Sequence, residues 1–176
     1  MIKIIKYSNN SEFVSKLRQE VFTFGYNSAL DSGLFDTLAE AQQFAKQVII
    51  DAFENAPNKQ HCFEICSDNN MVGCAWLRDK HSPETQGEIR LSYIRIDPTY
   101  RRQGIASRSI KLLEEYAIKL GFTNMSLNVF SSLCHAKNLY ERLGFKIVHE
   151  TDKHGKIVTI EMVKLLAKQN APSTNN

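Results

Sequence analysis

A basic turn with a single glycine joins an apolar, β-branched run to an amphipathic stretch, and residues of these types at this spacing can bind phosphate. The turn contains Arg101, Arg102 and Gly104. At the start of a helix several backbone N–H groups have no intrahelical partner and the helix dipole is positive, so a diphosphate can bind there. Gly104 leaves these N–H groups unshielded. The spacing therefore predicts a phosphate site at residues 101–107, with an ordinary glycine turn and solvated arginines as the alternative.

Two signatures in sequence order narrow this site to one family. No pair of glycines has the spacing of a dinucleotide fingerprint, and no Gly-Lys-Ser/Thr run marks a P-loop. Arg101-x-x-Gly104-x-Ala106 resembles the Arg/Gln-x-x-Gly-x-Gly/Ala signature of the GNAT acyltransferase superfamily. The downstream run Leu127-Asn128-Val129, followed by Ala136-x-x-Leu139-Tyr140-x-x-x-Gly144-Phe145, is similar to that family's strand and its Ala-x-x-Leu-Tyr-x-x-x-Gly-Phe segment. The resemblance covers roughly residues 71–165.

The resemblance implies an α/β fold with a mixed central sheet of about seven strands, flanked by about four helices, in which the fourth and fifth strands splay apart. It implies acetyl-CoA as co-substrate, with its phosphates at the basic turn and its pantetheine arm bonded to backbone near the end of the fourth strand. One departure is Leu133, where members often have an asparagine. The implied cofactor-binding residues are Ile94, Arg95, Ile96, Arg101, Arg102, Gln103, Gly104, Ile105, Ala106, Ser107, Asn128 and Tyr140.

Tyr140 is the predicted acid. Acetyl transfer from a thioester to an amine needs an uncharged amine, a polarised carbonyl and a stabilised thiolate. The thiolate should be about as basic as that of cysteine, near pKa 8.5, so a tyrosine with a pKa near 10 can donate a proton or a hydrogen bond to it. Tyr140 stands where the resemblance places such a tyrosine. Alternatively, Tyr140 belongs to the apolar stripe of its helix and only packs.

Glu88 is the predicted general base, on the ground of strand alternation. In a strand from Glu88 to Ile96 alternate residues share a face, which places Glu88 with Ile94 and Ile96 on the side that leads to the acetyl group. Against this, Glu88 and Arg90 lie two residues apart on one face and can form an exposed ion pair. In some GNAT enzymes the acidic residue stands at the position of Arg90.

The acceptor site is predicted over residues 22–35, between the first two helices. Two glycines and several turn-forming residues indicate an irregular connection, which carries more apolar surface than a solvated loop needs. Tyr26 and Asp31 lie beyond the buried stripe of the first helix, and a carboxylate beside an aromatic ring can receive an ammonium group. Alternatively, the aromatic residues of this segment, above all Phe22 and Phe24, cap the core.

Hydrophobic periodicity predicts the elements that position these residues. Ser11 can cap a first helix that ends near Phe24, and residues 68–70 form the turn of a strand hairpin. The order is strand, two helices, three strands, helix, strand, helix and two strands. The predicted strands span residues 2–7, 61–67, 71–78, 87–96, 123–130, 145–151 and a last stretch that ends near 165; the helices span 11–24, 36–55, 103–120 and 133–143.

Length and composition indicate a single cytosolic domain. With 176 residues, 43% of them hydrophobic, the chain can bury one core, predicted over residues 1–168 with a disordered tail at 169–176. The first residues lack the apolar stretch and cleavage site of a signal peptide. A net charge of +3 without basic and aromatic runs gives no support to nucleic-acid binding. The four cysteines lack zinc-ligand spacing, so we expect reduced packing cysteines and no metal.

Together these observations predict an acetyl-CoA-dependent N-acetyltransferase that transfers the acetyl group directly to a primary amine. A small-molecule amine is the first expectation for the acceptor and a peptide or protein amine the second, with no membrane partner. The chain is expected to be a monomer or a homodimer. The alternative is a non-catalytic acyl-CoA-binding regulatory domain with the same fold, because Leu133 replaces the asparagine and the base is uncertain.

Overall fold

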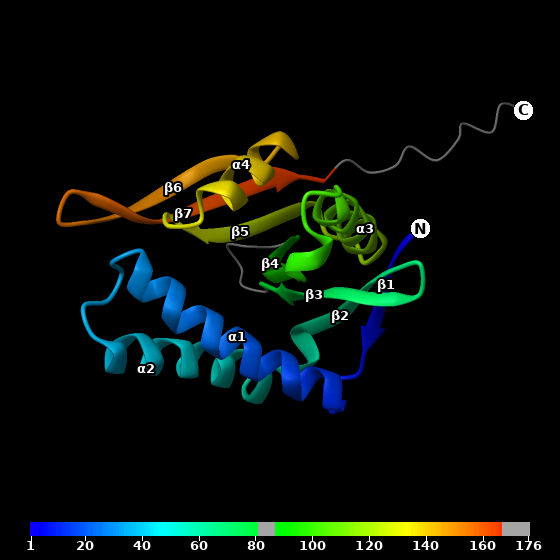
Figure 1. Ribbon diagram of the computed structural model, residues 1–176, viewed down its shortest axis with the longest axis horizontal. Helices are drawn as coiled ribbons and strands as arrows, with labels where there is room; N and C mark the ends of the chain where they lie inside the picture. Colours follow the sequence, from blue (N-terminus) through cyan, green and yellow to red (C-terminus); the bar gives the residue numbers. More distant parts are fainter. Residues whose placement is uncertain (81–86, 167–176) are drawn as a thin grey trace, which may run out of the picture.

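The computed structural model describes residues 1–80 and 87–166, which form a seven-stranded sheet with helices on both faces (Figure 1). The predicted tail at 169–176 lies outside the described residues. The order of elements is the predicted one, with short helical turns at Ile50–Glu54, Pro57–Lys59 and Pro98–Tyr100. The strands are β1 (Ile2–Tyr7), β2 (Gln60–Ser67), β3 (Asn70–Asp79), β4 (Glu88–Ile96), β5 (Asn124–Phe130), β6 (Lys146–Lys153) and β7 (Lys156–Leu165); the helices are α1 (Glu12–Asp31), α2 (Leu38–Ile49), α3 (Ile105–Lys119) and α4 (Cys134–Arg142).

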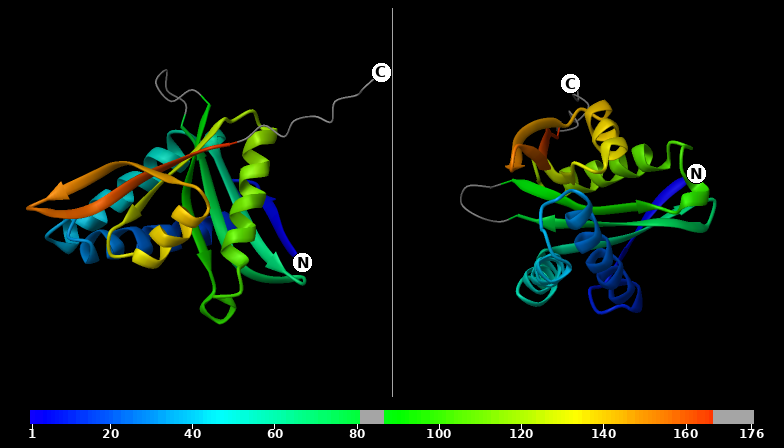
Figure 2. Two further views of the ribbon diagram at one scale, coloured as in Figure 1. Left: turned by 90° about the horizontal axis from the view of Figure 1, so that it is seen from above. Right: turned by 60° about the vertical axis from the view of Figure 1, so that its left-hand side comes forward.

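The strand order β1-β2-β3-β4-β5-β7-β6 contains one parallel pair, β4 with β5, among the described strands. Helices α1 and α2 cover one face of the sheet, and α3 and α4 cover the other (Figures 1 and 2). The parallel pairing joins Glu88–Arg90 to Asn124–Ser126 and continues no further. Beyond it β4 and β5 diverge, as the left view of Figure 2 shows, and the implied splay of the fourth and fifth strands is confirmed.

A β-bulge in β4 lies just beyond the last residue that pairs with β5. Trp76 of β3 pairs with Tyr93, whereas the next residue, Leu77, pairs with Leu91, so Ser92 is the extra residue. Leu91 therefore joins the core between the sheet and α3 with α4, and Tyr93 joins the core beneath α1. Two residues that plain alternation would place on one face of the sheet lie on opposite faces.

The bulge makes one sequence prediction wrong. Glu88 was expected to share a face with Ile94 and Ile96. Ile89 packs in the core beneath α3, so Glu88 next to it points to the α1 and α2 side. Ile94 and Ile96 follow the bulge and pack against the α3 core instead. An inserted residue shifts the alternation of everything after it.

Helix α1 extends further than predicted: it ends at Asp31 instead of near Phe24. Glycine inside a helix costs about 1 kcal/mol relative to alanine, but packing against α2 outweighs this cost here. Ser28 and Ala29 continue the buried stripe, and a Cβ on Gly25 would lie 3.5 Å from Cβ of Ala45. The predicted irregular connection over residues 22–35 is therefore helical up to Asp31.

Local sequence signals at other ends of elements are confirmed. The Ser11 side chain accepts a hydrogen bond from the Val14 N–H at 3.2 Å and caps α1. Asp68 and Asn69 adopt positive φ in the turn between β2 and β3, as a tight hairpin requires. Helix α2 begins two residues later than predicted, because Thr37 and Glu40 form a reciprocal capping box.

Candidate active site

The divergence of β4 and β5 opens a cavity of 790 Å³ on the side of the sheet that carries α3 and α4. Its walls come from the end of β4, the glycine turn, the start of α3, the end of β5 and helix α4. Eleven of the twelve predicted cofactor-binding residues line it, which are Ile94, Arg95, Ile96, Arg101, Arg102, Gly104, Ile105, Ala106, Ser107, Asn128 and Tyr140. Gln103 does not; its side-chain amide reaches the Thr99 carbonyl at 3.5 Å.

The glycine turn presents an open helix N-terminus to this cavity. Gly104 is the N-cap of α3 with φ of +71°, a left-handed conformation that glycine adopts without strain, and no side chain caps the helix. A Cβ at Gly104 would meet no atom of the surrounding chain within 4 Å, so the space into which a side chain would project there is open. The N–H groups of Ile105, Ala106 and Ser107 precede the first intrahelical partner and are available to an anion.

The arginines of the turn brace the backbone as well as supplying charge. Arg101 Nε donates to the Ile96 carbonyl at 2.9 Å and ties the turn to the end of β4. Arg108 donates to the Gln103 carbonyl at 2.9 Å, on the outer side of the turn. Arg102 has φ of +61° and lines the cavity. The predicted phosphate site thus has donors, positive charge and room for a diphosphate.

Tyr140 lies on α4 and lines the same cavity, close to full burial. Its ring packs against Phe145 with centroids 5.7 Å apart, and its hydroxyl makes no hydrogen bond to another described residue. Burial raises the pKa of Tyr140 to about 12. The hydroxyl therefore keeps its proton at neutral pH and has a free donor for a group bound in the cavity.

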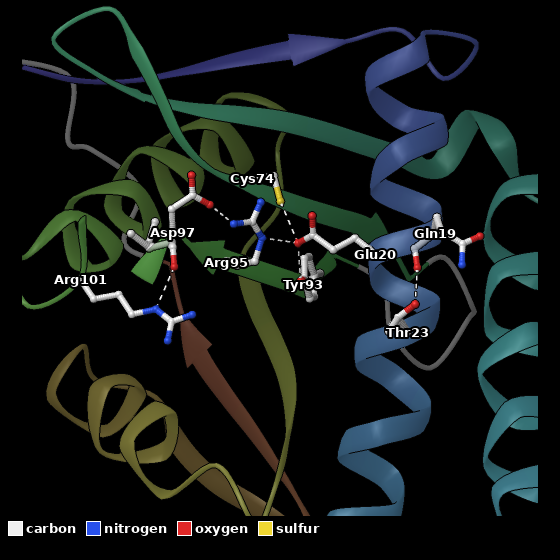
Figure 3. Close-up of polar contacts among 9 residues, drawn as sticks. Gln19, Glu20, Thr23, Cys74, Tyr93, Arg95, Asp97 and Arg101 are labelled. Carbon is white, nitrogen blue, oxygen red and sulfur yellow. Dashed lines mark hydrogen bonds and ion pairs between the residues drawn. The ribbon is translucent and has the colours of Figure 1, made fainter. Parts of the chain in front are cut away.

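The carboxylate of Glu20 in α1 contacts three side chains near the end of β4 (Figure 3). This carboxylate accepts hydrogen bonds from the Tyr93 hydroxyl at 2.6 Å and from the Cys74 thiol at 3.7 Å, and it pairs with Arg95. Arg95 also pairs with Asp97. Burial and the hydrogen bond to Glu20 raise the pKa of Tyr93. The Arg95 side chain thus points to α1.

The structure does not bring Glu88, Tyr26 or Asp31 to the cavities. The Glu88 carboxylate accepts a hydrogen bond from Ser126 and lies 3.4 Å from Lys80 Nζ. Tyr26 packs on Phe22 with ring centroids 5.3 Å apart. Asp31 is the exposed last residue of α1. None of the three lines the 790 Å³ cavity or the second one described next.

A second cavity of 340 Å³ lies on the opposite face, between α1, α2 and the sheet. It shares lining residues with the first at the bulge and the end of β5, so the two cavities meet where β4 and β5 diverge. Phe24 and Leu34 line it, and both belong to the predicted acceptor segment. Sequence reasoning missed Arg78 and the role of Arg90 in this cavity. The one signal for Arg78 is its alternation with Trp76 on β3, and Arg90 is found only through its pairing with Arg78.

A cleft between a diverging parallel pair, with a glycine turn at the start of the following helix, defines the acetyltransferase class of fold. The sequence matches the acetyltransferase (GNAT) family over residues 23–145, well over half of the chain. The chain belongs to this family, and the resemblance drawn from its two signatures is confirmed.

Relatives agree with this assignment. An uncharacterized N-acetyltransferase of Bacillus subtilis, YycN, is 28% identical over 116 residues, which are 64% of this chain and 72% of that protein. Its crystal structure superposes with a TM-score of 0.75 at 21% identity, covering 86% of this chain and 97% of that one. A GNAT acetyltransferase of Elizabethkingia anophelis with acetyl-CoA bound has the same fold, with a TM-score of 0.61, 12% identity and coverage of 94% and 98%.

A further solved structure is the spermidine N-acetyltransferase of Vibrio cholerae in complex with CoA and spermine. It superposes with a TM-score of 0.62 at 15% identity, covering 95% of this chain and 96% of that one. Within residues 1–80 and 87–166 we find no helix long and apolar enough to cross a membrane.

Proposed function

We propose that this protein is an acetyl-CoA-dependent N-acetyltransferase that transfers the acetyl group directly to a primary amine of a small molecule. The observation that carries the proposal is the meeting of two cavities at the divergence of β4 and β5. The first cavity contains the open N-terminus of α3, and the second is bounded by α1, α2 and the sheet. A thioester donor and an amine acceptor can therefore approach each other from opposite faces of the sheet.

The residues of the first cavity fit acetyl-CoA. The N–H groups at the start of α3, with Arg101 and Arg102, would hold its phosphates, because nothing shields them in front of Gly104. The edge of β4 at Ile94–Ile96 pairs with β3 on one side only among the described strands. Apart from the Ile96 carbonyl, which accepts from Arg101, the backbone groups on its other side are available to the amides of a pantetheine arm. When bound, acetyl-CoA supplies an activated acyl group with a thiolate leaving group.

Tyr140 stabilises the departing sulfur by a hydrogen bond. Its pKa of about 12 lies well above that of a thiol, near 8.5, so complete proton transfer to the thiolate is unfavourable. A neutral hydroxyl that no described residue engages can nonetheless donate to a group bound in the cavity that Tyr140 lines. The amine nitrogen attacks the carbonyl carbon, the carbon–sulfur bond breaks, and the proton of the amine leaves to solvent.

A direct assay tests this proposal. Purified protein is incubated with acetyl-CoA and a panel of primary amines, and release of free thiol is followed, while calorimetry measures the binding of acetyl-CoA. We expect binding and turnover with at least one amine. Binding without turnover across the panel would instead favour the non-catalytic acyl-CoA-binding domain, and absence of binding would refute both.

A further inference from the structure

Two arginines stand side by side in the second cavity. Arg78 of β3 and Arg90 of β4 are direct partners in the antiparallel register, so their side chains leave the sheet on the same face. Both line the cavity, and no acidic residue lines it within the described part of the chain. Like charges opposite each other on a sheet are destabilising, so the pair has a cost in the free protein that a bound anion would remove.

The acidic groups nearby do not neutralise this pair. Arg90 donates to Glu161 at 2.8 Å, but the same carboxylate oxygen lies 3.7 Å from Lys80 Nζ, and Arg90 Nε is buried without a partner. Arg78 makes no hydrogen bond or ion pair to another residue within 1–80 and 87–166. Burial and the neighbouring Arg90 lower the pKa of Arg78, and Asp51 offsets this only in part. The cavity therefore has an excess of unsatisfied guanidinium donors.

The remaining walls of the cavity are mostly apolar, and their polar residues are Ser92, Tyr93, Asn128 and Thr159. Phe24, Phe44 and Trp76 contribute aromatic surface. Ser92, the bulge residue, lines both cavities and has a buried hydroxyl without a hydrogen-bond partner. A volume of 340 Å³ suits a small molecule rather than a folded partner. The cavity thus combines an anion-binding end, an aromatic body and an opening towards the thioester.

We propose that the acceptor is a primary amine that carries a carboxylate on an apolar or aromatic body, with the carboxylate bound between Arg78 and Arg90. A guanidinium fork binds a carboxylate through paired hydrogen bonds. The same positive charges disfavour an ammonium group nearby and favour the neutral amine that attack requires. The inference rests on the proposed function, whose acceptor site it describes.

Turnover tests the inference with matched amines. 4-(Aminomethyl)benzoate and phenylalanine are compared with benzylamine and 2-phenylethylamine, which lack the carboxylate. For at least one pair we expect a kcat/KM at least tenfold higher for the carboxylate. Arg78→Gln should raise the KM of that substrate about 10- to 100-fold with little change in kcat or in the KM of its neutral counterpart. Equal kcat/KM values within both pairs would overturn the inference.

Two controls keep the result interpretable. Lys156→Gln removes one positive charge at an exposed position outside both cavities and should leave every KM unchanged. Arg78→Gln removes a like-charge contact, so its unfolding temperature should equal or exceed that of the wild type. A loss of carboxylate preference in a variant of undiminished stability is a loss of binding and not of folding.

Binding separates this inference from the proposed function. Calorimetry with 3-phenylpropionate, in the presence of CoA, measures recognition of the carboxylate without any acetyl transfer. We expect tighter binding than for 3-phenylpropan-1-ol, and at least a tenfold loss in Arg78→Gln. Should no amine be acetylated, the proposed function fails while this measurement still decides the carboxylate site. Equal binding of the acid and the alcohol, or an unaffected variant, would refute it.

Discussion

Gly73 of β3 provides the sharpest structural test, because it lies under the backbone that faces the acetyl-CoA cavity. A Cβ added there would stand 2.1 Å from the Arg95 carbonyl oxygen and 3.1 Å from Cδ1 of Ile96. Ordinary contact begins near 3.4 Å, so the carbonyl must move by about 1.3 Å. Overpacking of this kind costs about 1–3 kcal/mol. We therefore expect Gly73→Ala to lower the free energy of unfolding by that amount.

The same displacement should weaken acetyl-CoA binding. The Arg95 carbonyl faces β3, and its neighbours Ile94 and Ile96 belong to the free edge of β4 that is proposed to bond the pantetheine arm. A shift of Arg95 displaces that edge, so loss of about one hydrogen bond predicts roughly a tenfold weaker affinity. Urea titration measures the first effect and calorimetry the second. Gly25→Ala is the matched control, since its Cβ makes an ordinary 3.5 Å contact inside α1, and it should stabilise the protein by about 1 kcal/mol.

The two outcomes for Gly73→Ala are separable. Unchanged stability would show that β3 and β4 have more room than the backbone geometry gives them. Lower stability with unchanged affinity for acetyl-CoA would refute the role of this edge of β4 in the cofactor site. A stabilised Gly25→Ala variant in the same experiments shows that alanine itself is not the cause.

Three further predictions concern the site. Gly104→Val should lower the affinity for CoA at least tenfold, as measured by calorimetry. The control Gly155→Val has the same open surroundings and a φ of +79°, so it should have the same backbone strain but bind CoA normally. Equal CoA affinities of the two variants would refute the phosphate site. Tyr140→Phe should lower kcat about a hundredfold with little effect on acetyl-CoA binding, and wild-type turnover in the variant would mean that the tyrosine only packs. Because burial raises the pKa of Tyr140 to about 12, the rate of the wild-type enzyme should show no loss from ionisation of Tyr140 below about pH 11. Glu88→Gln should change kcat less than about threefold, since the carboxylate is engaged by Ser126 and Lys80 outside both cavities, and a hundredfold fall would restore Glu88 as the base.

Local signals predicted much of this fold. Ser11 caps α1, Asp68 and Asn69 make the hairpin turn, and Gly104 takes the left-handed conformation that begins α3. Each of these features depends on residues that are neighbours in the sequence, so the sequence alone is enough to predict it. The end of α1 could not be predicted in this way, because the packing of Gly25 against Ala45 of α2 is a tertiary contact.

The acceptor side of the site could not be predicted from the sequence either, because it too depends on contacts between distant segments. The bulge at Ser92 is defined by the register of β4 against β3. No local signal in the sequence from Glu88 to Ile96 indicates the extra residue. Alternation therefore assigned Glu88 to the wrong face. The pairing of Arg78 with Arg90 likewise joins residues of two strands, and their shared cavity is closed by helices from elsewhere in the chain.

The bulge and the divergence of the strands act together to build the site. Arg90 is the last β4 residue that pairs with β5, and Ser92 is the bulge residue two positions on. Ending the pairing leaves the backbone of residues 91–96 without a second neighbouring strand among those described, and buried N–H and C=O groups require partners. The bulge at the same point turns Tyr93 towards Glu20 while Arg90, before it, still faces the second cavity. Two irregularities at one point of β4 thus produce an edge suited to amide hydrogen bonds on the donor side and a cationic pocket on the acceptor side.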